Sequence, residues 1–253
     1  MTGTNPSALY LTPANSLGVA VITRPWPEGR FCLSGLTYCT VLSFPVGAET
    51  VYLETIDGVG VEADLIRSDA PIVRAIVVIG HPHPLHGGDR FNHVVQAMQR
   101  AAAQADCHSI AVDFRGVGNS GGFHDNGDAE RLDLAAACEL ADLIETDCPI
   151  IMTGYSFGSV VGLNVSNPWI AGWIAIAPPV ALMASTPGAA SSPRPKVLVA
   201  PEHDQFTTPD AMREAVANWS NTEVVDALTI DHFIATGSDE ICAQALSRIL
   251  ETL

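Results

Sequence analysis

One stretch of ten residues, 150–159, constrains the fold of this chain more than any other. It opens with an apolar run too short for a helix and ends in the pattern Gly-x-Ser-x-Gly, centred on Ser156. A segment with the apolar spacing of a helix, 160–165, follows directly. A strand, a sharp turn and a helix in this order form a nucleophile elbow, in which the flanking glycines let strand and helix approach closely. We therefore predict that Ser156 is exposed at the carboxyl end of a strand as a nucleophile. The alternative is an inert serine in a glycine-rich turn.

From residue 50 onward, the chain alternates predicted strands and helices. A β-hairpin is predicted over 50–66, where two segments of alternating polarity flank Asp57-Gly58. Later strands and helices follow in strict alternation, which predicts an α/β fold with a mostly parallel, doubly wound sheet and helices on both faces. Between 177 and 196 there is too little chain for a folded lid, so no large cap domain is expected. The predicted strands are 73–79, 109–114, 150–155, 170–177, 196–200 and 223–230, and the predicted helices are 91–105, 128–145, 160–165, 209–219 and 238–250.

The first 40 residues follow no such pattern, because prolines at 6, 13, 25 and 27 interrupt them. We expect residues 1–40 to form an irregular amino-terminal extension that packs on the domain, with one strand near 19–23. Residues 41–253 are predicted to form a single α/β domain, since a chain of this length buries enough surface to need no disulfide or metal.

Composition limits the partners of the chain. Twelve basic and 28 acidic residues give a net charge of −16, which disfavours binding to nucleic acid or an anionic membrane. The six cysteines form no Cys-x-x-Cys pair and are expected to be free thiols. No continuous apolar run is long enough to span a membrane, and no basic residue precedes the first apolar stretch. We expect a cytoplasmic protein, and composition indicates no particular oligomeric state.

A serine nucleophile needs a base to take its proton and an acid to orient that base. In elbow proteins these groups follow the serine in the order acid, then histidine. Asp204 is favoured as the acid because it lies four residues past the strand that ends near residue 200, and Glu202 is the alternative. His232 is predicted to be the base, since it follows the last strand. Its alternative role is to cap the helix that comes next.

The developing oxyanion needs two backbone N–H donors. One is expected from Phe157, the residue after the serine, and the other from the loop 81–88 after the 73–79 strand. The prolines of this loop have no N–H, which leaves His83 as the favoured donor and Leu85 as the next choice.

Two other patterns suggest ligand sites, but we interpret both as structural. The four histidines and one aspartate between 81 and 93 could form a metal cluster, yet the prolines extend the segment and send alternate rings apart. We expect no metal and assign the His81 ring to hydrogen bonds within the turn. The glycine-rich loop 115–122 lacks the Lys-Ser/Thr of a phosphate-binding loop, so it is predicted to be a tight turn beside the site. An Asp113–Arg115 ion pair is expected to brace it.

Three motifs together resemble the α/β-hydrolase superfamily. They are Gly-Tyr-Ser-Phe-Gly at 154–158, His-Pro-His-Pro with Gly-Gly at 81–88, and Asp-Phe-Arg-Gly-Val-Gly-Asn-Ser at 113–120. Within the superfamily, the chain resembles small bacterial serine hydrolases related to dienelactone hydrolase and simple esterases. The resemblance runs from about residue 50 to the end of the chain. It departs from the family at Pro201, where a glycine is common, and it does not cover residues 1–40.

The resemblance implies a Ser156–His232–Asp204 triad and acyl hydrolysis without a metal or organic cofactor. We expect a serine hydrolase that cleaves small carboxylic esters through an acyl-enzyme, at a shallow and open site. The alternatives are a thioesterase, lactonase or peptidase with the same triad, or a non-catalytic interaction protein with the same fold. Four aromatic residues are expected to bind the substrate, namely Phe123, Tyr155, Phe206 and Phe233.

Overall fold

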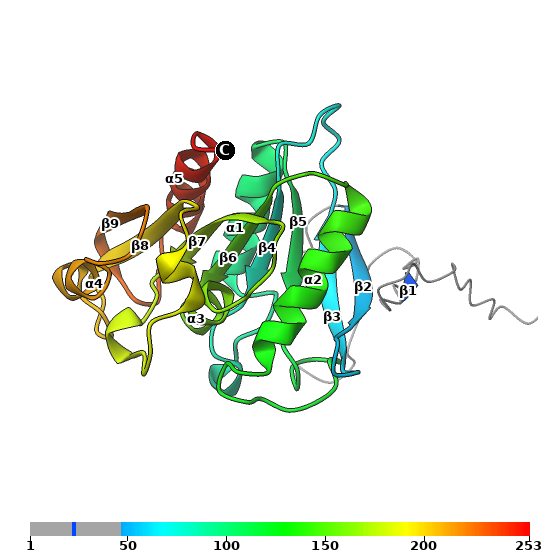
Figure 1. The fold of residues 1–253 in the computed structure, drawn as a ribbon, viewed down its shortest axis with the longest axis horizontal. Coiled ribbons are helices and arrows are strands. Elements are labelled where there is room, and N and C mark those ends of the chain that lie inside the picture. The colour runs from blue at the N-terminus through cyan, green and yellow to red at the C-terminus, as the bar shows by residue number, and fades with distance from the viewer. Residues whose placement is uncertain (1–21, 24–46) are drawn as a thin grey trace, which may run out of the picture.

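The computed structural model describes residues 22–23 and 47–253. Within them, nine strands form one sheet with the order β1-β2-β3-β5-β4-β6-β7-β8-β9 (Figure 1). The pairs β1–β2, β2–β3 and β3–β5 are antiparallel, and every other pair of neighbours is parallel. The strands are β1 (Ile22–Thr23), β2 (Ala48–Glu54), β3 (Gly60–Ile66), β4 (Ile76–Gly80), β5 (His108–Val112), β6 (Ile150–Tyr155), β7 (Ile170–Ile176), β8 (Lys196–His203) and β9 (Thr222–Asp231).

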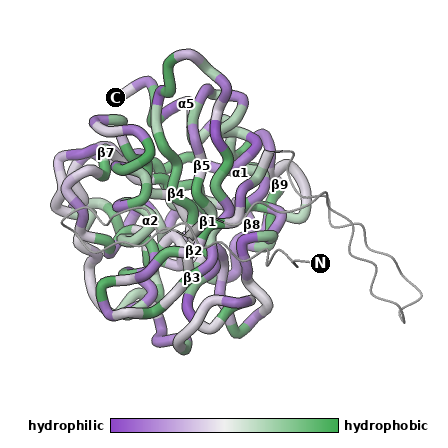
Figure 2. Tube along the Cα trace, turned by 90° about the vertical axis from the view of Figure 1, so that its right-hand side faces the viewer, coloured by the Kyte–Doolittle hydropathy of each residue, from purple (hydrophilic) through white to green (hydrophobic). Residues whose placement is uncertain are grey.

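Helices cover both faces of the sheet. On one face α1 and α5 pack on one hydrophobic core, while α2, α3 and α4 pack on a second core on the other face. The hydrophobic parts of the chain run through central strands such as β4 and β5 (Figure 2). This arrangement confirms the predicted α/β-hydrolase fold without a cap domain. The helices are α1 (His93–Gln104), α2 (Glu130–Ile144), α3 (Phe157–Leu163), α4 (Pro209–Ala215) and α5 (Ser238–Leu250).

Most predicted elements lie where the sequence placed them. The hairpin is formed by β2 and β3, and Gly58 takes a left-handed φ of 78° in the turn between them. Helix α4 is shorter than predicted, because after Ala215 the chain leaves the helix in a series of turns that lead into β9. The connection 178–195 contains two short 3-10 helices and no larger element.

The amino-terminal prediction is tested only at β1, which lies within the expected 19–23 strand and pairs with β2. The remaining predictions for residues 1–40 concern positions outside the described residues. No helix in the described ranges is both long and apolar enough to cross a membrane.

Candidate active site

Ser156 lies in a strained turn between β6 and α3. Its φ of 51° and ψ of −116° are unfavourable for a residue with a side chain, at a cost on the order of 1–3 kcal/mol. The glycines on either side make this turn possible, because the elbow is packed against backbone. A Cβ on Gly154 would lie 2.3 Å from the carbonyl carbon of Gly158, and one on Gly158 would lie 2.3 Å from the Gly80 oxygen. The elbow geometry predicted from Gly-x-Ser-x-Gly is therefore present.

A chain of hydrogen bonds connects Ser156 to Asp204 through His232. The Ser156 Oγ lies 2.9 Å from Nε2 of His232, and the Nδ1 of His232 lies 2.8 Å from Oδ2 of Asp204. Only 3% of Asp204 and 5% of His232 are exposed. Since a carboxylate only accepts hydrogen bonds, Nδ1 carries the proton and Nε2 is free to accept one from the serine.

Both ends of the imidazole–carboxylate pair are anchored. The second carboxylate oxygen of Asp204 accepts N–H bonds from Phe206 at 2.7 Å and Thr207 at 3.1 Å. The Tyr155 hydroxyl donates to the main-chain oxygen of His232 at 2.7 Å. Burial raises the pKa of Tyr155, and the nearby charge of Asp204 raises it further, so the hydroxyl stays protonated and can donate. Tyr155 thus positions His232, a role that its place beside the serine did not indicate.

The structure does not support the two alternatives, which were Glu202 as the acid and His232 as a helix cap. Glu202 is exposed, and its carboxylate accepts the Thr229 N–H at 2.7 Å, away from the imidazole. Helix α5 begins after Gly237 with no side-chain cap, so His232 does not cap it.

Phe157 and His83, the two residues predicted to supply the oxyanion donors, are neighbours in the structure. Phe157 is the first residue of α3, so its N–H is among those that a helix leaves unpaired. The His83 N–H has no hydrogen-bond partner within the described chain. The His83 carbonyl accepts from the N–H of His86 and of Gly88, at 3.0 and 3.1 Å, which holds this peptide in place. The rings of His83 and Phe157 are in contact, with centroids 5.0 Å apart.

His81 is a structural residue, as predicted. Its Nδ1 bonds to the Pro82 oxygen at 2.6 Å, and its Nε2 accepts the Phe114 N–H at 3.1 Å. Complete burial lowers the pKa of His81 to about 4, so the ring is neutral at physiological pH. Among the described residues, no group of three or more His, Cys, Asp or Glu is arranged to hold a metal ion.

The predicted Asp113–Arg115 ion pair is wrong. Asp113 pairs with Arg90, whereas Arg115 binds Asp57 at 2.8 Å and Asp133 of α2 at 2.7 Å. The chain turns just after Phe114, so the two side chains leave in different directions. The bonds of Arg115 tie the loop after β5 to both the hairpin turn and α2.

A family model described as the alpha/beta hydrolase family matches residues 80–250. This chain belongs to that family.

Solved structures share the fold of this chain, and one further protein is similar in sequence. An alpha-beta serine hydrolase homologue from Coxiella burnetii is 25% identical with a TM-score of 0.74, covering 82% of this chain and all of that one. A serine hydrolase without a lid from Xanthomonas campestris is 22% identical with a TM-score of 0.71, covering 83% and 97% of the two chains. An uncharacterised protein of Rickettsia prowazekii is 29% identical over 172 residues, which are 65% of this chain and 70% of that protein.

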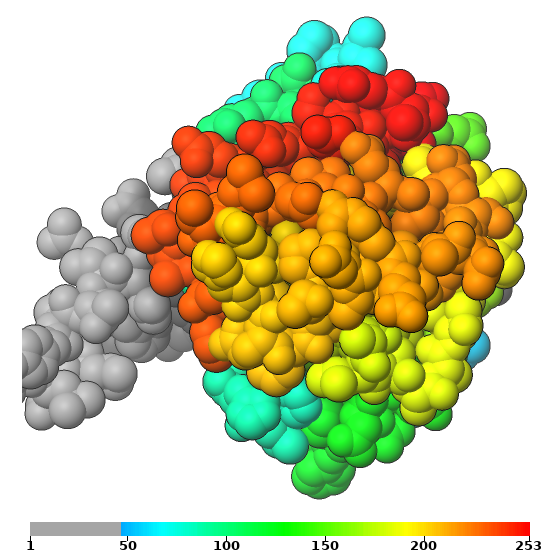
Figure 3. Space-filling model, turned by 90° about the vertical axis from the view of Figure 1, so that its left-hand side faces the viewer, coloured from blue at the N-terminus to red at the C-terminus, as the bar shows by residue number. Residues whose placement is uncertain are grey.

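In this alpha/beta hydrolase, a cavity of about 940 Å³ opens beside Ser156. The loop 81–88, the loop before α2 and the connection 178–195 surround it, and the corresponding segments lie near one another on one face of the molecule (Figure 3). These loops build the walls of the cavity.

Three of the four aromatic residues predicted to bind the substrate line this cavity. They are Tyr155, Phe206 and Phe233, and the Phe206 ring packs on His232 with centroids 4.5 Å apart. The prediction for Phe123 is wrong: its side chain is 88% exposed and lies outside the cavity, while the next residue, His124, turns inward. Four further polar residues line the cavity and belong to no motif in the sequence: Asn92, Asn126, Arg131 and Asn164. His86 and His93, which the sequence suggested only as possible metal ligands, line it too.

Proposed function

We propose that this alpha/beta hydrolase is a serine hydrolase that cleaves small carboxylic esters through an acyl-enzyme intermediate. The observation that carries the proposal is the buried chain of hydrogen bonds from Ser156 Oγ to His232 and on to Asp204, at 2.9 and 2.8 Å. A carboxylate, an imidazole and a hydroxyl joined in this way are the groups that activate a serine nucleophile. A further support is the likeness in fold to an esterase from Pyrococcus furiosus, which is 20% identical with a TM-score of 0.67 and covers 87% of this chain and 97% of that one.

In the proposed reaction, His232 Nε2 takes the proton of Ser156 as Oγ attacks the ester carbonyl carbon. The carbonyl oxygen becomes an anion and accepts hydrogen bonds from the N–H groups of Phe157 and His83. The protonated His232 then donates to the oxygen of the leaving alcohol, and the C–O bond breaks. Water, deprotonated by the same imidazole, releases the acid and restores the serine. Asp204 holds the imidazole in the required tautomer throughout, and no step needs a metal or organic cofactor.

A fluorophosphonate probe tests this proposal directly, because it reacts with a serine only where a base and an oxyanion hole activate it. We expect one adduct on intact protein, mapped to Ser156 by mass spectrometry of its peptides, and no adduct on the Ser156→Ala variant. An ester, thioester, lactone and peptide panel then identifies the bond. A folded wild-type protein that stays unlabelled would instead support a non-catalytic interaction protein.

A further inference from the structure

The lining of the cavity beside Ser156 contains an aliphatic part and a histidine part, and polar residues such as Asn126, Arg131 and Asn164 complete it. One part, which we call the aliphatic part, consists of Val160 and Val161 of α3 with Leu182 and Met183 of the connection 178–195. The other, which we call the histidine part, consists of Asn92 and His93 at the start of α1, since His83 packs against Phe157 on the side of α3.

The two parts lie on opposite faces of the sheet. Val161 belongs to the core under α2 and α3, and Met183 packs against that core. Ile234, two residues after His232, belongs to the core under α1 and α5, and the His93 ring bonds to its main-chain oxygen at 3.0 Å. The segment that carries His232 therefore lies on the side of the histidine part.

This placement orients an ester, given the proposed function. The leaving alcohol must take its proton from His232 Nε2, so it lies toward the histidine part. With the carbonyl oxygen directed at the N–H groups of Phe157 and His83, the acyl chain extends the other way, along α3 and into the aliphatic part. The polar and aliphatic walls thus face different parts of one substrate.

The size of the cavity indicates how long the acyl chain is. About 940 Å³ is near the upper end of the roughly 300–1,000 Å³ typical of pockets for drug-sized ligands, and far more than an acetyl group fills. Leu182 at its rim is 66% exposed, so an aliphatic chain lying there would cover apolar surface that now faces solvent. We propose that the substrates are esters of a medium-length aliphatic acid, such as hexanoic acid.

A chain-length series with matched leucine variants tests this specificity. Leu228 is the control for Leu182, because it is 68% exposed but lies outside the cavity. For p-nitrophenyl esters, we expect wild-type kcat/KM to rise at least about tenfold from acetate to hexanoate, since each buried methylene is worth up to roughly fourfold. Leu182→Ser should reduce this ratio about threefold to tenfold by lowering kcat/KM for the hexanoate ester and not for the acetate ester. Leu228→Ser should leave the ratio unchanged. A wild-type ratio near one, or equal effects of Leu182→Ser on both esters, would overturn the proposal.

Binding of the product acid gives a measurement that needs no turnover. By calorimetry, hexanoate should bind more tightly than acetate to the wild type and to the Leu228→Ser and Ser156→Ala variants, and lose this advantage in Leu182→Ser. Equal affinities of hexanoate and acetate for the wild type would refute the aliphatic subsite. Tight hexanoate binding without Ser156-dependent turnover would refute the proposed function while leaving the subsite intact.

A second inference rests on a different observation: the ring of His124 contacts both residues that would supply the oxyanion donors. Its centroid lies 4.9 Å from the His83 ring and 5.4 Å from the Phe157 ring. Those two rings are themselves 5.0 Å apart, so the three rings pack against one another. His124 does not line the cavity, so it acts on the donors and not on the substrate.

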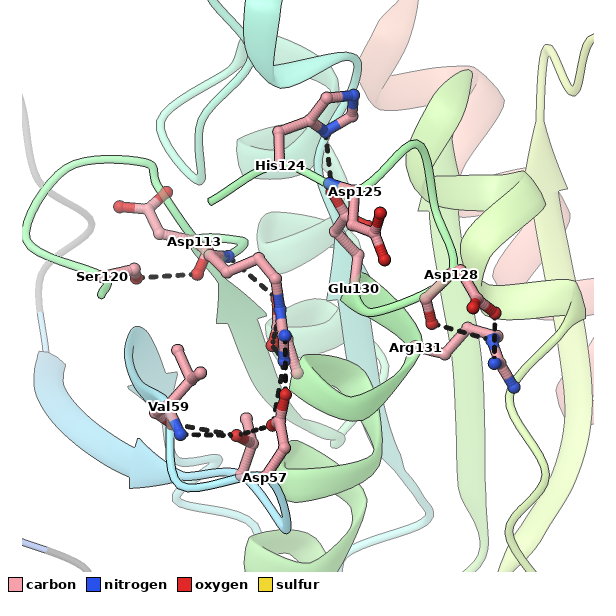
Figure 4. A network of polar contacts seen from close by, with 12 residues as sticks. Asp57, Val59, Asp113, Ser120, His124, Asp125, Asp128, Glu130 and Arg131 are labelled. Carbon is pink, nitrogen blue, oxygen red and sulfur yellow. Dashed lines mark hydrogen bonds and ion pairs between the residues drawn. The ribbon is translucent and has the colours of Figure 1, made fainter. Parts of the chain in front are cut away.

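A buried carboxylate holds His124 in this position. Its Nδ1 lies 2.7 Å from Oε1 of Glu130, the first residue of α2, and the Glu130 side chain is fully buried (Figure 4). The same carboxylate accepts the N–H groups of Asp125 at 2.8 Å and Gly127 at 2.9 Å. We infer that Glu130 and His124 are positioning residues that fix the peptides of His83 and Phe157 for the oxyanion.

The kinetics of three variants test this role. Titration with a fluorophosphonate gives the concentration of active sites in each preparation. Asp133→Asn is the control, because Asp133 is equally buried one turn along α2 but binds Arg115. We expect His124→Ala to lower kcat about tenfold to 100-fold with little change in KM. Small displacements of aligned catalytic groups slow a reaction by about this factor. His124→Asn, whose polar amide can keep a contact with Glu130, should recover part of the loss. Asp133→Asn should lower the melting temperature and keep kcat. Wild-type kcat in His124→Ala, or the same kcat loss in Asp133→Asn, would overturn the inference.

Discussion

Replacing Ser156 with alanine is expected to lower the turnover of a p-nitrophenyl ester by about 10⁴-fold to 10⁶-fold, the scale found when a serine hydrolase loses its nucleophile. The variant removes only Oγ, which lies 2.9 Å from His232 Nε2 and makes no other hydrogen bond among the described residues. The strained backbone at φ 51° is unchanged, because alanine and serine have the same restrictions there. The melting temperature should therefore stay close to that of the wild type.

The measurement is the initial rate of p-nitrophenol release at saturating substrate, alongside thermal unfolding of both proteins. A folded Ser156→Ala protein that keeps more than a tenth of the wild-type rate would show that another group attacks the ester. A parallel loss of turnover and of fold would instead assign a structural role to the serine, which its half-buried position in the lining of the cavity argues against.

Replacing Asp204 with asparagine is expected to lower kcat by about 10⁴-fold, as it does where an aspartate orients a catalytic histidine. The Phe206 and Thr207 N–H groups bind one side-chain oxygen, so asparagine would keep its carbonyl oxygen there and turn its NH₂ toward His232. An NH₂ group donates, which favours the imidazole tautomer with the proton on Nε2. That tautomer has no lone pair to accept the serine proton.

Glu202→Gln is the matched control for Asp204→Asn. Glu202 is also a carboxylate of the same segment, but it is exposed and bonds only to the Thr229 N–H among the described residues. Its replacement should change kcat by less than about twofold, the scale of a surface substitution. A severe loss in Glu202→Gln with normal turnover in Asp204→Asn would transfer the role of the acid to Glu202.

Much of the architecture could be predicted because its signals are local. The 150–159 stretch indicated a strand, an elbow and a helix, and β6 and α3 lie there around Ser156. Alternating polarity located the hairpin, and the alternation of strands with helices located the later strands. All of them belong to one sheet. Asp204 was favoured over Glu202 because it was expected four residues past a strand that ends near residue 200. That reason is wrong, since β8 extends to His203, but Asp204 is the carboxylate that bonds to His232.

The predictions that failed concern side chains in irregular loops. Phe123 was expected in the cavity, but it faces solvent and His124 packs inward. Asp113 and Arg115 were expected to pair, but they bind Arg90 and Asp133. In a helix or strand, a fixed period decides which face a side chain occupies. A loop has no such period, so the direction of each side chain depends on the particular turn.

The sequence by itself determined the fold family and the position of the elbow, because both rest on short-range patterns of polarity and glycine. It also indicated the chain order of the serine, acid and histidine that we propose for the triad. Only the tertiary structure decided which loop residues build the walls of the cavity and that Glu130 holds His124 against the rings of His83 and Phe157. These contacts join segments from the ends of different strands. Their partners are chosen by packing across the edge of the sheet, which no local pattern in the chain encodes.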